Sequence, residues 1–195
     1  MSLCDDVRPL AGTRVRLRPA TETDVAAFTA LFRDPGVTLW WPAPDPEAEA
    51  RDHAGRHSDE PDGAQWAIEW PAAPAGTGLL GSEVIGLVQA YEETDPDFRH
   101  ASIDIALAST AQGLGLGPDA VRAVARFLFD VRGHHRLIID PAASNERAIR
   151  AYASVGFRPV GVMRAYQRLP AEGWVDALLM DLLAGELREA ESPGG

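Results

Sequence analysis

Apolar and polar residues alternate along several short stretches of the chain, a pattern typical of strands with one buried face. The alternation covers residues 13–18, 64–70, 82–93 and 102–107, and an apolar run at 134–140 has the length of a fully buried strand. Two later stretches, 157–168 and 174–183, are separated by LPAEG and predict a final antiparallel pair.

Helical spacing of apolar residues separates these strands. Thr21 or Thr23 can cap a helix with Val25, Phe28 and Leu31 on one face, and 47–57 predicts a second helix. A third is predicted at 118–129, and Ser144 or Asn145 can cap a fourth that closes at Gly156. Strands and helices alternate, so we predict an α/β (α+β) protein with a mixed sheet flanked by helices.

A glycine-rich turn, QGLGLG at 112–117, joins the strand at 102–107 to the helix at 118–129. Gly113, Gly115 and Gly117 allow backbone angles closed to other residues and leave room for an anion. Backbone N–H groups converge at the following helix N-terminus, where pyrophosphate is a natural ligand. We expect Gly117 as N-cap and Pro118 as the first helical residue. The spacing and position of the glycines exclude a Rossmann dinucleotide fingerprint.

Size and composition indicate one domain. The chain has 195 residues, of which 46% are hydrophobic, enough for one core and few for two. We expect a single domain over 1–185 and a flexible tail over 186–195. No apolar run approaches the length of a membrane helix, and the N-terminus lacks signal-peptide character, so we expect a cytoplasmic protein.

Metal and disulfide chemistry find little support in the sequence. The single cysteine, Cys4, excludes an internal disulfide and a cysteine metal cluster. His53 and His57 are spaced i, i+4, but no third ligand accompanies them. We therefore expect no metal.

Charge narrows the choice of ligand. Lys plus Arg number 18 and Asp plus Glu number 29, giving a net charge of −11. This argues against nucleic acid as a partner, which needs a basic face. It favours a cationic ligand, although simple solubility explains the same balance.

The glycine turn and the helix after it resemble two ordered motifs of the GCN5-related N-acetyltransferase (GNAT) superfamily. In that family Gln/Arg-x-x-Gly-x-Gly/Ala contacts the pyrophosphate of acetyl-CoA, and Gln112, Gly115 and Gly117 occupy its positions. Pro118 departs from the small hydroxyl residue of many relatives. The second motif is matched by Asn145, Ala148, Tyr152, Gly156 and Phe157.

This resemblance implies the GNAT fold, a mostly antiparallel twisted sheet of about seven strands with about four helices, and acetyl-CoA as co-substrate. It also implies an oxyanion-binding N–H near Leu107, where strands of the superfamily bulge. The cofactor residues that it implies are Leu107, Gln112, Gly113, Leu114, Gly115, Leu116, Gly117, Asn145, Ala148 and Tyr152.

A finer resemblance links WWP, GLVQAYEETDP, the SID strand and IIDPAASNERAIRAYASVGF to the aminoglycoside 6'-N-acetyltransferases. It implies that Asp104 handles the substrate amine and that Tyr152 protonates the departing sulfur. The acceptor-binding residues that we expect are Trp40, Trp41, Gln89, Tyr91, Asp95, Asp104 and Asp140. The last hairpin and residues 47–63 match poorly, which leaves the acceptor open.

The chemistry fits these residue types. An alkyl amine with a pKa near 10.4 is almost entirely protonated at pH 7, so Asp104 can serve as a base or bind the ammonium. Several carboxylates around one cleft suit a polycationic small-molecule acceptor. Acetylation of a protein N-terminus or another small amine, and a non-catalytic acyl-CoA module, are the alternatives. The protein is expected to be a monomer or homodimer.

Overall fold

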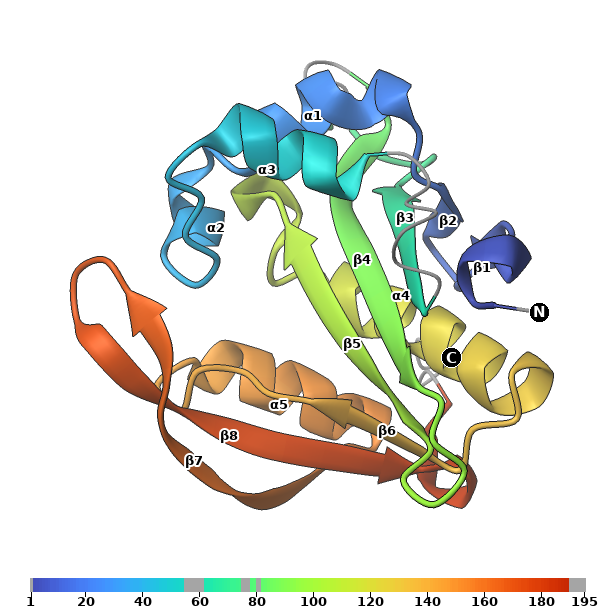
Figure 1. Ribbon diagram of the computed structural model, residues 1–195. Coiled ribbons are helices and arrows are strands. Elements are labelled where there is room, and N and C mark those ends of the chain that lie inside the picture. Colours follow the sequence, from blue (N-terminus) through green and yellow to red (C-terminus); the bar gives the residue numbers. More distant parts are fainter. Residues whose placement is uncertain (1, 55–61, 75–77, 80–81, 190–195) are drawn as a thin grey trace, which may run out of the picture.

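The computed structural model describes residues 2–54, 62–74, 78–79 and 82–189, and its central element is one twisted sheet (Figure 1). The strands are β1 (Leu10–Ala11), β2 (Arg16–Pro19), β3 (Gly63–Glu69), β4 (Val84–Glu93), β5 (His100–Leu107), β6 (Arg136–Ile139), β7 (Arg158–Leu169) and β8 (Gly173–Leu183). Their spatial order is β1-β2-β3-β4-β5-β6-β8-β7, and all neighbours are antiparallel except β5 and β6.

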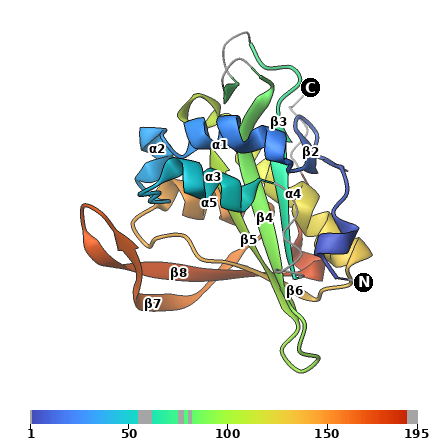
Figure 2. The same cartoon turned by 45° about the horizontal axis from the view of Figure 1, so that its top comes forward.

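Helices cover both faces of this sheet (Figures 1 and 2). One face carries the helices before β3, and the other carries the helices that flank β6. The α-helices are α1 (Val25–Leu31), α2 (Pro35–Thr38), α3 (Pro46–His53), α4 (Leu116–Arg126, continued by a π-helical turn, Phe127–Val131) and α5 (Glu146–Val155).

The period-two pattern of the central strands sends side chains into two separate cores. On β3, Trp66 and Ile68 face the core under α4, whereas Ala67 faces the core under α1. On β4, Val88 faces the core under α4 and Leu87 faces the core under α1. Both faces of these strands are therefore buried, and the central sheet is a rigid base for its more exposed edges.

The predicted fold class and sheet are confirmed, with small differences. The described residues form eight strands rather than about seven, because Leu10 and Ala11 add a short edge strand, β1. They also form five α-helices rather than four. The additional helix, α2, is a single turn that Asp34 and Pro35 initiate, and the Asp34 side chain accepts the Gly36 N–H at 2.8 Å.

One predicted helix start is wrong. Helix α4 begins at Leu116, with Gly115 as its N-cap at a left-handed φ of 77°, and not at Pro118. Pro118 lies inside the first turn, where its missing N–H still costs no helical hydrogen bond.

The C-terminal segment is tied to the helices as far as it is described. Arg122 Nε donates to the Arg188 carbonyl at 2.9 Å, and the Arg188 N–H donates to Val155 at 2.8 Å. The rest of the predicted tail, 190–195, lies outside the described residues. Among the described residues no helix combines the length and apolar character needed to span a bilayer.

Candidate active site

Strands β5 and β6 separate shortly after they meet, and this opening forms the main cavity. They pair at Ala101↔Leu137 and Ser102↔Ile138 and then diverge (Figure 1). The cavity has a volume of about 910 Å³, within the range of small-molecule sites. Its walls come from α2 and the residues after it, β5, the glycine turn, the end of β6, α5 and β7.

The backbone of β5 faces this opening on one side. The Ala108 N–H bonds Ile85 at 2.9 Å, and the β4–β5 register continues regularly from Gly86↔Leu107. Since antiparallel pairs alternate between bonded and non-bonded, the N–H groups of Ile105 and Leu107 point away from β4 into the opening. The implied bulge near Leu107 is absent from this register, and the geometry does not require one.

The glycine turn forms one end of the cavity. Gly113 and Gly115 have φ values of 76° and 77°, which side chains tolerate poorly. No side chain caps the first turn of α4, so its N-terminal N–H groups remain directed at this end. Gly117 has an ordinary φ, and a Cβ there would lie 3.3 Å from the Leu107 side chain. Close packing explains this third glycine.

Side chains from elsewhere hold the turn in place. Gln112 Nε2 donates to the Leu107 carbonyl at 2.7 Å, which ties the turn to the end of β5. Arg14 donates to the Leu114 carbonyl at 2.6 Å. The Asp119 carboxylate accepts three backbone N–H bonds from Thr13, Arg14 and Val15. Contacts within the chain thus fix the conformation of the turn.

Two carboxylates face each other across the opening, Asp104 on β5 and Asp140 at the end of β6. Burial and the nearby negative charge of Asp140 raise the pKa of Asp104 to about 6. A weak bond from Gln89 Nε2, at 3.4 Å, opposes this rise. A carboxylate with a pKa near 6 is a better base than the ordinary aspartate that the sequence alone could assume.

Tyr152 of α5 lines the same cavity. Burial, followed by the charges of Asp104 and Asp140, raises the pKa of its phenol well above the usual value. The surroundings thus make Tyr152 a weaker acid than an ordinary tyrosine. They also keep it protonated at neutral pH, as a proton donor must be.

Both tryptophans that follow α2 line the cavity. Trp41 donates to the Glu49 carboxylate at 2.9 Å and packs edge-on against His53, with ring centroids 5.3 Å apart. The Trp40 carbonyl accepts a bond from Gln167 at 2.8 Å. Trp41 also packs on Phe32, so this side chain contacts both the core and the cavity.

Comparisons with known proteins identify the family of this site. The profile of the acetyltransferase (GNAT) domain matches residues 14–158. The chain belongs to the GNAT acetyltransferase family. It is therefore an N-acetyltransferase, as the glycine turn and the α5 motif predict.

Several known acetyltransferases are similar to this GNAT protein in sequence or structure. An aminoglycoside N(6')-acetyltransferase type 1 from Klebsiella pneumoniae is 30% identical over 161 residues, which cover 76% of each chain. The structure of aminoglycoside acetyltransferase AAC(6')-Ib in complex with coenzyme A is 26% identical, with a TM-score of 0.68 over 88% of this chain and 96% of that one. Mycobacterium smegmatis RimJ, in complex with CoA-disulfide, has a TM-score of 0.74 over 93% and 88% of the chains and 23% identity, which shows the fold alone.

Most predicted site residues of this GNAT protein meet at the cavity. Asp104, Asp140 and Tyr152 lie together there. The other predicted residues that line it are Trp40, Trp41, Leu107, Gln112, Gly113, Gly115, Gly117, Asn145 and Ala148. The Asn145 side chain also caps α5, accepting the Ala148 N–H at 3.1 Å.

Other predicted residues do not reach the cavity lining. Gln89 lies on β4 directly opposite Asp104 and contacts it on the same face of the sheet, and Tyr91 bonds Gln89. Asp95 lies in the exposed β4–β5 turn, where it accepts the Asp97 N–H at 2.9 Å. The start of β5 at His100 is already about 13 Å from Asp104 by the rise of an extended strand. The structure thus does not bring Asp95 to the two central carboxylates.

The leucines of the turn differ from its glycines. The Leu116 side chain is fully buried in the core and that of Leu114 is 44% exposed, so what either can offer a phosphate is its N–H. The His53–His57 pair cannot be assessed, since His57 lies outside the described residues. Within the described ranges no group of three His, Cys, Asp or Glu side chains is placed to hold a metal.

Sequence reasoning missed two lining residues on β7, Tyr166 and Gln167, and Arg147 on α5. The β7 stretch reads as an ordinary strand, and no local signal shows which face of it meets the cavity. A break in the alternation around Ala165 is the one feature that could have pointed there.

Proposed function

We propose that this GNAT protein transfers the acetyl group of acetyl-CoA to a primary amine of a polycationic aminosugar, as in 6'-N-acetylation of aminoglycosides. The observation that carries the proposal is the pair Asp104 and Asp140 on opposite sides of the β5–β6 opening, with the raised Asp104 pKa. The aminoglycoside acetyltransferases among the relatives support the choice of acceptor.

Acetyl-CoA suits the cavity at both of its ends. The pyrophosphate of the co-substrate fits the N–H groups between Gln112 and Asp119, where left-handed glycines and the start of α4 favour an anion. The outward N–H groups of Ile105 and Leu107 can donate to carbonyl oxygens of acetyl-CoA, either in its extended arm or in its thioester. Such a pose directs the thioester towards Asp104 and Tyr152.

In this pose, a residue of the cavity can assist each step of the acetyl transfer. Asp104 removes a proton from the acceptor ammonium, and the free amine attacks the thioester carbonyl carbon. A backbone N–H at Leu107 stabilises the resulting oxyanion. The carbon–sulfur bond breaks and Tyr152 gives its phenolic proton to the thiolate. The attacking nitrogen, which is positively charged after the attack, loses its second proton to the phenolate through water, and the proton held by Asp104 is released to solvent. The products are an amide and free coenzyme A.

A polycation explains the second carboxylate. A monoamine needs one base, whereas an aminosugar with several ammonium groups gains from a further charge at Asp140. Placing the reacting ammonium between both carboxylates also offsets the repulsion that raises the pKa of Asp104.

The test is a panel of amines with acetyl-CoA, with free thiol as the readout and product mass as the check. Kanamycin, spermidine and a short peptide with a free N-terminus represent the competing acceptor classes. We expect kanamycin to have the highest kcat/KM and to gain a single acetyl group at its 6'-amine. A preference for the peptide would favour protein N-terminal acetylation, and coenzyme binding without turnover of any amine would favour a non-catalytic module.

A further inference from the structure

The arm formed by β7 and β8 contains a large irregularity beside the cavity. Met163 pairs with Ala177 and Gln167 pairs with Val175, so three residues of β7 oppose Asp176 alone. At the centre of this bulge Ala165 has a φ of 49°, uncommon for a residue with a side chain. Bulges of this kind re-aim the next side chain along the strand, which is Tyr166.

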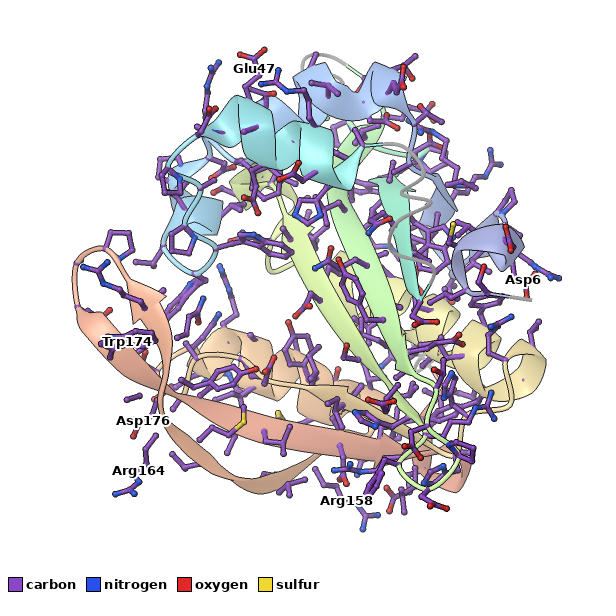
Figure 3. The ribbon with its side chains drawn as sticks, in the orientation of Figure 1. Asp6, Glu47, Arg158, Arg164, Trp174 and Asp176 are labelled. Atoms are coloured by element: carbon purple, nitrogen blue, oxygen red, sulfur yellow. The ribbon has the colours of Figure 1, made fainter. Side chains whose placement is uncertain are left out.

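Asp176 holds the bulge and connects it to the segment that carries Asp140. Its Oδ1 atom accepts the Ala165 N–H at 2.8 Å, and Figure 3 marks Asp176 on this arm. Its carbonyl accepts the Ala143 N–H at 2.8 Å, and the Leu178 N–H donates to Pro141 at 2.9 Å. Residues 176–178 of β8 therefore fix both the direction of the Tyr166 side chain and the position of the backbone that follows Asp140.

Tyr166 reaches the acceptor side of the cavity through this arrangement. Its hydroxyl donates a hydrogen bond to the Asp140 carboxylate, and that bond, with burial and the charges of Asp140 and Asp104, raises the pKa of the phenol to about 12. The residue remains 52% exposed, so part of its surface stays available to a ligand in the cavity that it lines. Gln167 attaches the same strand to the Trp40 carbonyl at 2.8 Å.

We propose that Tyr166 is a specificity-determining residue of the acceptor site. Its hydroxyl fixes the orientation of the Asp140 carboxylate, and its ring forms the wall against which the non-reacting part of a polycationic acceptor binds. This inference rests on the proposed function and adds to it a residue of the C-terminal hairpin. It predicts that the hairpin controls acceptor affinity without affecting the coenzyme.

Steady-state kinetics of Tyr166→Phe tests the proposal. Loss of the hydroxyl leaves the ring in place and removes one hydrogen bond to a charged group. We expect the KM for kanamycin to rise about tenfold, with kcat and the KM for acetyl-CoA unchanged. Trp174→Phe is the control, because Trp174 lies on the same arm, is 65% exposed and does not line the cavity.

Two variants of Asp176 separate a role in positioning from a loss of folding. Asp176→Ala removes the acceptor of the Ala165 N–H and should raise the KM for kanamycin as Tyr166→Phe does. Asp176→Asn keeps an oxygen at the same place and should restore the wild-type KM. Melting temperatures of the variants show whether each stays folded.

The outcomes distinguish this inference from the proposed function. If spermidine or the peptide is the better substrate, the aminoglycoside proposal fails, and the Tyr166 comparison is made with that amine. Calorimetric titration of the coenzyme-saturated protein with kanamycin gives a second reading without turnover. A wild-type KM and a wild-type binding constant in Tyr166→Phe would overturn the assignment, and no binding of any amine would overturn both.

Discussion

At Asp104, burial favours the protonated carboxyl group, whereas the proposed catalysis needs the ionised carboxylate. Its raised pKa of about 6 means that the folded protein disfavours the carboxylate, while the proposed base must be ionised to act. We expect kcat/KM to fall as the pH drops through about 6. Asp104→Asn should remove this acid limb and lower kcat by about 10²- to 10⁴-fold. A pH–rate profile that is unchanged in the variant would remove Asp104 from the mechanism.

The same shift predicts an effect on stability. The pKa of Asp104 rises from 3.8 when exposed to about 6 in the folded protein, so the folded state binds more protons between these values. The contribution of this group therefore becomes less favourable as the pH rises from about 4 to about 6, and it stays unfavourable at pH 7. Asp104→Asn should raise the free energy of unfolding at pH 7 by on the order of 1–3 kcal/mol, measured by urea denaturation.

Single residues also show what can be inferred before a structure exists. Asp104, Tyr152 and the glycines lie in stretches that resemble motifs of the GNAT family, and this resemblance implied that they meet at one cavity. Tyr166 was not predictable, because its direction depends on a bulge that Asp176 holds from another strand. The perturbed pKa values of Asp104 and Tyr152 could not be predicted from the sequence either, since burial depends on the packing of the whole sheet.

At the scale of elements, the turn before α4 combines strained backbone with an uncapped helix start. Gly115→Asp should abolish binding of coenzyme A, because it places a carboxylate against the phosphates and a side chain at a φ of 77°. Gly133→Asp is the matched control: Gly133 has a φ of 69°, and an added Cβ there meets nothing within 4 Å. It introduces the same charge and similar strain away from the cavity.

Calorimetric titration with coenzyme A should thus separate the two aspartate variants. Binding that survives in Gly115→Asp would refute the phosphate site. Equal loss in both variants would indicate that destabilisation, and not charge at the turn, causes the effect.

Element boundaries were predicted less well than the elements themselves. The Pro118 signal for a helix start is sound in isolation, but the left-handed Gly115 allows the helix to begin two residues earlier. The short elements β1 and α2 carry too few residues to show a periodicity. Both are held by neighbours, β2 for the first and the Asp34 cap for the second.

At the scale of the whole molecule, a buried ion network joins the N-terminus to the end of the π-helical turn. Arg132 forms two bonds with the Glu92 carboxylate, at 2.9 and 2.8 Å, and His134 lies 2.8 Å from it. Arg132 also pairs at 3.3 Å with Asp6, which Figure 3 labels near the N-terminus. The residues of the network do not line the cavity, and we expect them to contribute to the stability of the fold.

Removal of the central carboxylate should be costly. Arg132 and His134 hold the pKa of Glu92 at about 2 against the opposing effect of burial, from a usual 4.5. The stabilisation is therefore present above pH 4.5 and is lost as the pH falls from there to about 2. Glu92→Gln should lower the free energy of unfolding at pH 7 by about 3–5 kcal/mol.

The surface pair Glu47–Arg51 provides the control for this network. The Glu47 side chain is 58% exposed, so Glu47→Gln should cost less than about 1 kcal/mol. Similar losses in the two variants would show that the Glu92 network adds nothing beyond an ordinary surface ion pair.

The net charge of −11 predicts how salt affects the two substrates. A polycationic acceptor is attracted by the field of the whole protein, and the attraction weakens as the Debye length falls from about 30 Å at 0.01 M salt to about 8 Å at 0.15 M. The KM for kanamycin should therefore rise severalfold over this range. The KM for anionic acetyl-CoA should not rise with it, and a parallel increase in both would exclude steering by charge.

The outward edge of β5 gives a way to follow coenzyme binding without chemistry. Ile105 and Leu107 direct their N–H groups into the opening, while the alternating residues Asp104 and Ala106 bond β4. A ligand that extends along this edge would act as the missing neighbouring strand. It would slow amide hydrogen exchange at Ile105 and Leu107, and this two-residue rhythm would show that the ligand lies along the edge of β5.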